Sequence, residues 1–128
     1  MKYMLLMNTT AQNWSSFDTM KQEDIKKHVD FMRGINAELG RTRELIDAQG
    51  LTPPPLTKIV RAGANGAVVT DGPFPETKEF LAGYWLLDCK SPERVIEIAA
   101  KISTAPGPGG QPMNFPLEIR PVGQAPEV

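Results

Sequence analysis

The chain reads Val68-Val69-Thr70-Asp71-Gly72-Pro73-Phe74-Pro75-Glu76-Thr77-Lys78-Glu79 at the point where a β-prone run enters a tight turn. Glycine accepts positive φ, whereas proline fixes its own φ and restricts the residue before it. The Asp71 side chain can accept hydrogen bonds from amides later in the turn. The residues predict a rigid exit from a strand, which either only directs the chain or holds Asp71, Glu76, Lys78 and Glu79 at the mouth of a pocket.

The segments on either side of this turn are strand-like. Phe80 to Asp88 is apolar on both alternating faces, which predicts a central strand covered on both sides, with one of Tyr84 and Trp85 facing helices and the other a partner sheet. Upstream, Asn65-Gly66 separates two β-prone runs and predicts a hairpin. The other expected strands and those of the hairpin are 3–7, 44–48, 57–61, 67–70 and 115–120.

Two segments have helical periodicity. Apolar residues recur at helical spacing between Thr19 and Leu39, with Thr19 and Gln22 in the pattern of a capping box and Gly40 as a stop. Ser91 followed by Pro92 predicts the start of a second helix. The order of elements predicts an α+β ferredoxin-like sandwich, in which an antiparallel sheet has two helices on one face.

These segments together resemble the YCII-related proteins, and the Asp71-Gly72-Pro73-Phe74 turn with Glu76, Lys78 and Glu79 resembles the signature of their DGPF-domain branch. The similarity extends over nearly the whole chain, from the opening strand through Gly50-Leu51-Thr52-Pro53-Pro54 and Ala82-Gly83-Tyr84-Trp85 to the last strand. The resemblance implies a dimeric α/β barrel, in which two sheets pair face to face. We therefore expect a homodimer.

Composition excludes several classes of function. A chain of 128 residues that is 41% hydrophobic is expected to form one domain, 1–128, and a net charge of −1 disfavours direct binding of nucleic acid. Absence of a long apolar run predicts no membrane span, and the single Cys89 fits a buried structural thiol in a cytoplasmic protein. With one His and one Cys, we expect no metal site and no cofactor.

His28 is the one histidine, and it lies on the apolar stripe of the first expected helix, which should turn it toward the sheet. Its plainest role is structural, with one hydrogen bond. The YCII resemblance implies another role, because a His on this helix and an Asp are taken as a catalytic dyad in YCII proteins outside the DGPF branch. Asp71 would then orient the imidazole, and His28 would serve as general acid or base on a small cyclic or aromatic compound.

A second candidate site needs no histidine. The expected fold places several charged residues on or beside neighbouring strands, where a carboxylate and an arginine could anchor a polar ligand near Tyr84 or Trp85; these are Arg61, Glu76, Glu79, Glu118 and Arg120, with Lys78 also a candidate. The same charges could instead form surface or interface ion pairs. The predicted function is a homodimer that binds a small polar or aromatic molecule. The alternative is a regulatory interaction module with a sigma-factor-type partner, which the resemblance to DGPF-type domains suggests.

Overall fold

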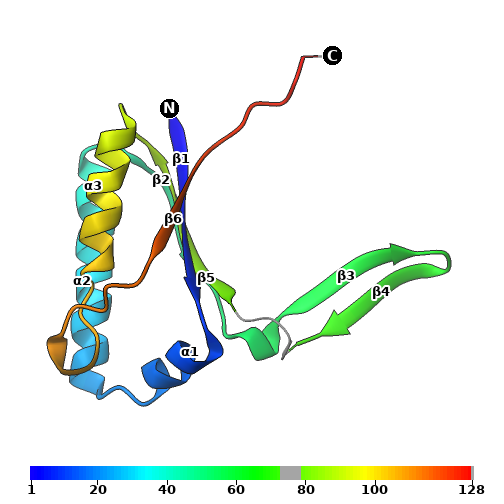
Figure 1. Ribbon diagram of the computed structural model, residues 1–128, viewed down its shortest axis with the longest axis horizontal. Coiled ribbons are helices and arrows are strands. Elements are labelled where there is room, and N and C mark those ends of the chain that lie inside the picture. Colours follow the sequence, from blue (N-terminus) through cyan, green and yellow to red (C-terminus); the bar gives the residue numbers. More distant parts are fainter. Residues whose placement is uncertain (73–78, 128) are drawn as a thin grey trace.

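The computed structural model describes residues 1–72 and 79–127 of the chain (Figure 1). The elements in chain order are β1 (Lys2–Thr9), α1 (Ala11–Asp18), α2 (Gln22–Arg41), β2 (Leu45–Gly50), a short 3-10 turn (Pro54–Leu56), β3 (Lys58–Gly63), β4 (Gly66–Asp71), β5 (Phe80–Asp88), α3 (Pro92–Ser103), a second 3-10 turn (Pro108–Gly110) and β6 (Leu117–Pro121).

Four strands form the main sheet in the order β2-β5-β1-β6, and every neighbouring pair is antiparallel. Helices α2 and α3 lie side by side on one face of this sheet (Figure 1). The predicted α+β architecture is therefore confirmed, and the order of the strands is compatible with a ferredoxin-like sandwich. Pairing of two such sheets into a barrel stays a prediction.

The hydrophobic core lies between the sheet and the two long helices. Its buried side chains come from both layers: Tyr3, Leu5, Trp85, Leu87 and Cys89 from the sheet side, and Ile35, Leu39, Val95, Ile98, Ala99 and Ile102 from the helices. The indole nitrogen of Trp85 donates to Asn36 Oδ1 of α2 at 2.9 Å, which satisfies a polar group that burial would otherwise penalise. Trp85 therefore faces the helices, and Tyr84 faces the opposite side of the sheet.

Cys89 is buried at the end of the core, as predicted. Burial, followed by the nearby Glu44 carboxylate, raises the pKa of its thiol above the usual value. A raised pKa favours the protonated, unreactive thiol over the thiolate.

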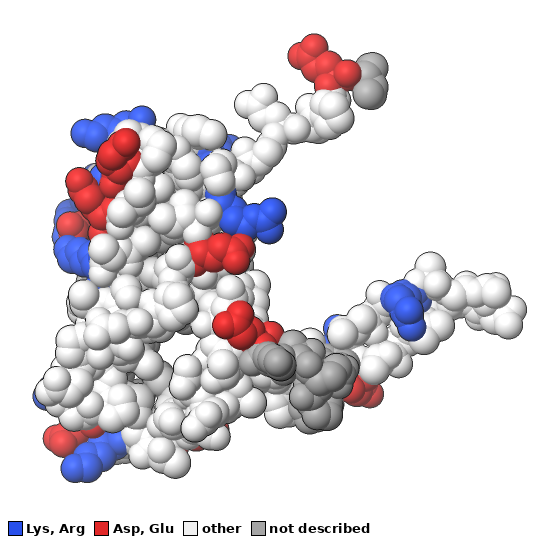
Figure 2. Space-filling view, in the orientation of Figure 1, with Lys and Arg blue, Asp and Glu red and all other residues white. Residues whose placement is uncertain are grey.

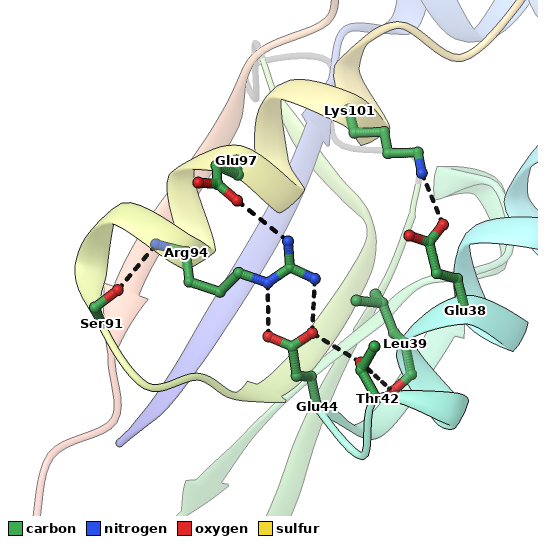
Figure 3. A network of polar contacts seen from close by, with 8 residues as sticks. All are labelled: Glu38, Leu39, Thr42, Glu44, Ser91, Arg94, Glu97 and Lys101. Carbon is green, nitrogen blue, oxygen red and sulfur yellow. Dashed lines mark hydrogen bonds and ion pairs between the residues drawn. The ribbon is translucent and has the colours of Figure 1, made fainter.

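A polar network joins the start of β2 to α3 and the end of α2 (Figure 3). The Arg94 guanidinium donates to both carboxylate oxygens of Glu44, at 2.8 Å from Nε and 2.7 Å from Nη2. Thr42 Oγ1 also donates to Glu44 at 2.7 Å, and Lys101 pairs with Glu38 at 2.7 Å. These contacts fix α3 against the α2–β2 connection.

The boundaries predicted for the first long helix need correction. The expected capping box of Thr19 and Gln22 does not form, because Thr19 is the C-cap of the additional helix α1 and the N-cap of α2 is Lys21. Gly40 lies inside α2, and the left-handed residue after the helix is Arg43, with φ 64°. Among the described helices, none is long and apolar enough to cross a bilayer.

The predicted hairpin is confirmed as β3 and β4, which form a separate two-stranded sheet within the described residues. The connection consists of Ala64 and Asn65, and Gly66 takes a φ of 116°. The positive φ that favours glycine is therefore at the residue after the turn. The hairpin extends away from the rest of the chain on the side of the sheet opposite α2 and α3 (Figure 1).

Candidate functional site

A pocket of about 560 Å³ lies between α1, the end of β1, the start of β5 and the loop that follows α3. Figure 2 shows it as a hollow between the helical layer and the sheet. Its walls combine three aromatic rings, three methionines and several amides and hydroxyls. Among the lining residues are Met7, Trp14, Phe17, His28, Glu79 and Phe115. Predominantly apolar walls with a few polar groups are typical of small-molecule sites.

His28 lines this pocket from the first turns of α2. Its Nδ1 lies 3.0 Å from the carbonyl oxygen of Pro106, and its ring meets that of Phe17 edge to face at a centroid distance of 5.2 Å. A carbonyl oxygen can only accept, so Nδ1 must carry the proton in this hydrogen bond. In the neutral imidazole, Nε2 is then the nitrogen with a free lone pair. The prediction that His28 faces the sheet holds in part, since the half-buried ring faces a pocket beside the sheet.

The loop after α3 is fixed to α2 at two points one helical turn apart. Besides the contact of His28 with Pro106, the amide of Gly109 donates to Asp24 Oδ2 at 3.0 Å, and Asp24 is buried. Gly109 and Gly110 have φ values of 67° and 74°, which glycine adopts without strain. This anchored loop forms one wall of the pocket.

A β-bulge shapes the opposite wall. Met7 pairs with Gly83 and Asn8 pairs with Leu81, so Ala82 is an extra residue of β5 with no partner in β1. A bulge re-aims the side chains next to it. Both Ala82 and Met7 consequently line the pocket.

Two of the lining residues are ionisable among those that the structure describes, namely His28 and Glu79. Both were candidates from the sequence, although they were expected in different sites. The structure brings them to one pocket, which no sequence pattern indicated.

The predicted dyad of His28 and Asp71 is not assembled in this chain. Asp71 ends strand β4 of the hairpin, where its exposed carboxylate pairs with Lys58 Nζ at 2.6 Å. His28 bonds instead to Pro106. The register of the hairpin accounts for this difference, since it places Lys58 directly opposite Asp71.

The charged residues of the second predicted site also lie apart. Glu118 and Arg120 alternate with the core-packed Leu117 and Ile119 on edge strand β6, so they occupy the sheet face away from the helices. Arg120 Nε is 3.9 Å from Glu118 Oε2, and Arg61 is on the hairpin. Two further candidates, Glu76 and Lys78, lie outside the described residues.

Tyr84 lies outside the pocket, on the open face of the sheet. Its hydroxyl donates to Asp47 Oδ2 at 2.7 Å, and Gln49 donates to the other carboxylate oxygen at 3.1 Å. The Tyr84 bond lowers the pKa of Asp47 and raises the pKa of Tyr84. Neither Tyr84 nor the core residue Trp85 lines the pocket.

Sequence reasoning missed helix α1, which supplies Trp14 and Phe17 to the pocket. The helix is short and contains no buried residue, so it lacks the apolar stripe that predicts a helix. One signal was present: Thr10 precedes it and accepts a hydrogen bond from the Asn13 amide at 3.1 Å, as an N-cap does. In the described part of the chain, no group of three or more His, Cys, Asp and Glu side chains could hold a metal ion.

The fold and the pocket define a small α+β protein with a ligand-sized cavity between its layers and an added helix. Comparison with known families identifies the class of protein more specifically, because residues 1–107 match the model of the YCII-related domain. The chain belongs to the YCII-related family. It is also similar to an uncharacterised protein of Rhizobium meliloti (strain 1021), with 28% identity over 122 residues that cover 95% of this chain and 92% of the relative.

Proposed function

We propose that this YCII-related protein binds a small ring compound in the pocket between α1, the sheet and the 105–116 loop. The observation that carries the proposal is the position of His28, whose Nδ1 contact with the Pro106 carbonyl leaves Nε2 as the acceptor in the neutral ring. An oriented acceptor in a largely apolar pocket suits a ligand with one hydroxyl or enol group.

The walls favour a flat, partly apolar ligand. Trp14, Phe17 and Phe115 supply aromatic rings, and Met7, Met20 and Met113 supply polarisable side chains that adapt to a ring. Asn8, Asn13 and Asn114 offer amides that could bond to a second polar group on the ligand. Phenols and enolised cyclic ketones fit this description.

The same geometry supports general acid/base chemistry. An imidazole held through Nδ1 by an acceptor keeps an unprotonated Nε2, which can take a proton from a hydroxyl or from carbon next to a carbonyl. Glu79 is the second ionisable group of the described pocket and could receive or return that proton. This role replaces Asp71, which pairs with Lys58, as the acidic partner in the proposed site.

The test is a ligand screen read through Trp14. This residue lines the pocket, whereas Trp85 is buried against α2, so the change of fluorescence caused by a bound ring should arise from Trp14. Phenols, enols and matched saturated rings would be tested for fluorescence change and for an increase in melting temperature, because a ligand of the folded state stabilises it.

Three variants make the screen specific. Trp14→Phe should remove the fluorescence response but keep the thermal shift, and His28→Asn should weaken binding of hydroxylated rings. Asp71→Asn, at the base of the hairpin, should leave binding unchanged. The proposed site would be contradicted if Asp71→Asn lost binding while His28→Asn kept it. That result would indicate that Asp71, and not His28, takes part in binding.

We also propose that the chain is a homodimer that pairs through the open face of its four-stranded sheet. Residues of β1 and β5 that alternate with the buried core residues form a half-buried apolar strip on this face, namely Met4, Leu6, Tyr84 and Leu86. In a single copy the helices cover only the opposite face. A second sheet would remove this strip from water.

A further inference from the structure

The β3–β4 hairpin is exposed over its full length. All twelve residues of its two strands are exposed, and the arm projects on the side of the sheet that the helices leave open (Figure 1). An isolated two-stranded hairpin is at best marginally stable in water. The arm therefore needs a further surface to pack against.

The two faces of the arm differ. The cross-strand pairs Val60–Val69 and Ala62–Ala67 lie on one face, which we call the valine face, and the Lys58–Asp71 ion pair closes this face at its base. The cross-strand pairs Ile59–Thr70 and Arg61–Val68 lie on the other face. The side chains of Val60 and Val69 are 60% and 53% exposed, compared with 47% for Ile59 and 48% for Val68, so the valine face is the more exposed of the two.

We propose that the arm is a clasp between two copies of this chain, with the valine face of each arm packed on the other copy. The inference rests on the proposed homodimer. It adds the β3–β4 hairpin to an interface that otherwise consists of the two open sheet faces. A two-fold axis through the open sheet would direct each arm toward the partner, because the arm and the sheet face the same side.

The area that a stable dimer must bury favours a second copy of this chain as the partner of the valine face. Four strands spaced by about 4.8 Å and about 20 Å long present roughly 400 Å², so two paired sheets bury roughly 800 Å². This is about the size of a crystal contact, whereas stable interfaces bury roughly 1,200–2,000 Å². Each arm is about 20 Å by 10 Å and would bury about 200 Å² on itself and as much on its partner, which brings the total to roughly 1,600 Å².

The experiment compares two matched double variants of the full chain. Val60→Lys with Val69→Glu places an opposite-charge pair at directly paired positions on the valine face, and Ile59→Lys with Thr70→Glu does the same on the other face. Both keep a favourable cross-strand pair, so the hairpin stays intact. The dissociation constant of the dimer would be measured by analytical ultracentrifugation, with the far-UV circular dichroism spectrum as a control for folding.

We expect the valine-face variant to raise the dissociation constant by roughly 100-fold or more, and the other variant to change it by less than about fivefold. Equal effects of the two variants, or no effect of either, would overturn the clasp while leaving the dimer in place. A wild-type chain that is monomeric at all concentrations would overturn both the clasp and the dimer. Ligand binding by that monomer would still support the proposed pocket, so the two failures are distinguishable.

Discussion

Glu44 shows how a single side chain ties the layers of this protein together. Its carboxylate accepts two hydrogen bonds from Arg94 and one from Thr42, and its side chain is only 14% exposed. The Arg94 bonds outweigh the effect of burial and lower the pKa of Glu44 from 4.5 to about 2. The charged form is therefore the one that the fold stabilises.

Replacement of this carboxylate should destabilise the protein in a pH-dependent way. Glu44→Gln removes a charge-assisted bidentate contact, and we expect the free energy of unfolding near pH 7 to fall by about 2 kcal/mol. Because the pKa is depressed on folding from 4.5 to about 2, the contribution of Glu44 is complete above pH 4.5 and is lost as the pH falls toward 2.

Urea unfolding of the wild type and the variant across this pH range measures the effect. Their stabilities should converge as the pH is lowered. A stability difference that stayed constant down to pH 2 would show that the ionisation of Glu44 is not responsible. Glu97→Gln provides a control, since Glu97 is a more exposed partner of the same arginine, at 68% exposure, and should cost little.

His28 allows two isosteric replacements that separate its two nitrogens. The side-chain amide nitrogen of Asn occupies the position of Nδ1 and can still donate to the Pro106 carbonyl. The amide nitrogen of Gln occupies the position of Nε2 instead, so the hydrogen bond to Pro106 is lost. We expect His28→Asn to keep the melting temperature within about 2 °C but to weaken the binding of hydroxylated rings about tenfold or more. His28→Gln should lower the melting temperature further by freeing the loop.

Calorimetry and ligand titration of the two variants provide the measurement. If His28→Asn bound phenolic ligands as tightly as the wild type, Nε2 would have no part in binding.

Periodicity predicted the large elements and missed the small ones, for physical reasons. The strands β1 and β5 and the helices α2 and α3 bury a full face, and burial imposes the period that the sequence shows. Helix α1 buries nothing, and the chain exits α2 through the left-handed Arg43 rather than the expected glycine. Neither feature leaves a hydrophobic pattern.

Substitution by alanine should change the stability of the protein in opposite directions at two glycines. Gly34 lies in the exposed interior of α2, where an added Cβ meets no atom within 4 Å, and Gly34→Ala should stabilise the protein by about 0.5–1 kcal/mol. In β5, a Cβ on Gly83 would lie 2.9 Å from the Gln49 carbonyl oxygen of the adjacent strand β2. Backbone must move to relieve this clash, so Gly83→Ala should destabilise the protein by about 1–3 kcal/mol.

Denaturant unfolding of the two variants checks both signs. A stabilising Gly83→Ala would mean that β2 and β5 are less closely paired than the structure shows.

For the whole molecule, family and fold were accessible from the sequence, whereas the site was not. The resemblance to YCII-related proteins extends along the chain, and the family match over residues 1–107 confirms it. The pocket, in contrast, joins His28 of α2, Glu79 before β5 and Trp14 of α1, which no spacing in the sequence links. The charged residues of the second predicted site, meanwhile, are separated because β6 and the hairpin direct them to different surfaces.

The proposed pairing of two sheets predicts that a charge on the open face prevents assembly. Leu6→Glu places a charge within the apolar strip of the open face, and burial of an unpaired carboxylate is costly. We expect the variant to be monomeric at concentrations where the wild type is a dimer, as determined by light scattering after gel filtration. Ile96→Glu is the control, because Ile96 is 57% exposed on α3 in the helical layer and should not affect assembly.

The site of protonation on the His28 imidazole decides whether Nε2 can accept a hydrogen bond from a ligand. The chain contains one histidine, so nitrogen NMR of protein labelled at this residue gives a single pair of ring signals. We predict a protonated Nδ1 and an unprotonated Nε2 in the neutral ring, and a selective shift of the Nε2 signal when a phenolic ligand from the screen is added. A neutral ring protonated at Nε2, or ring signals that do not change when such a ligand binds, would contradict the proposed role of His28 in ligand binding.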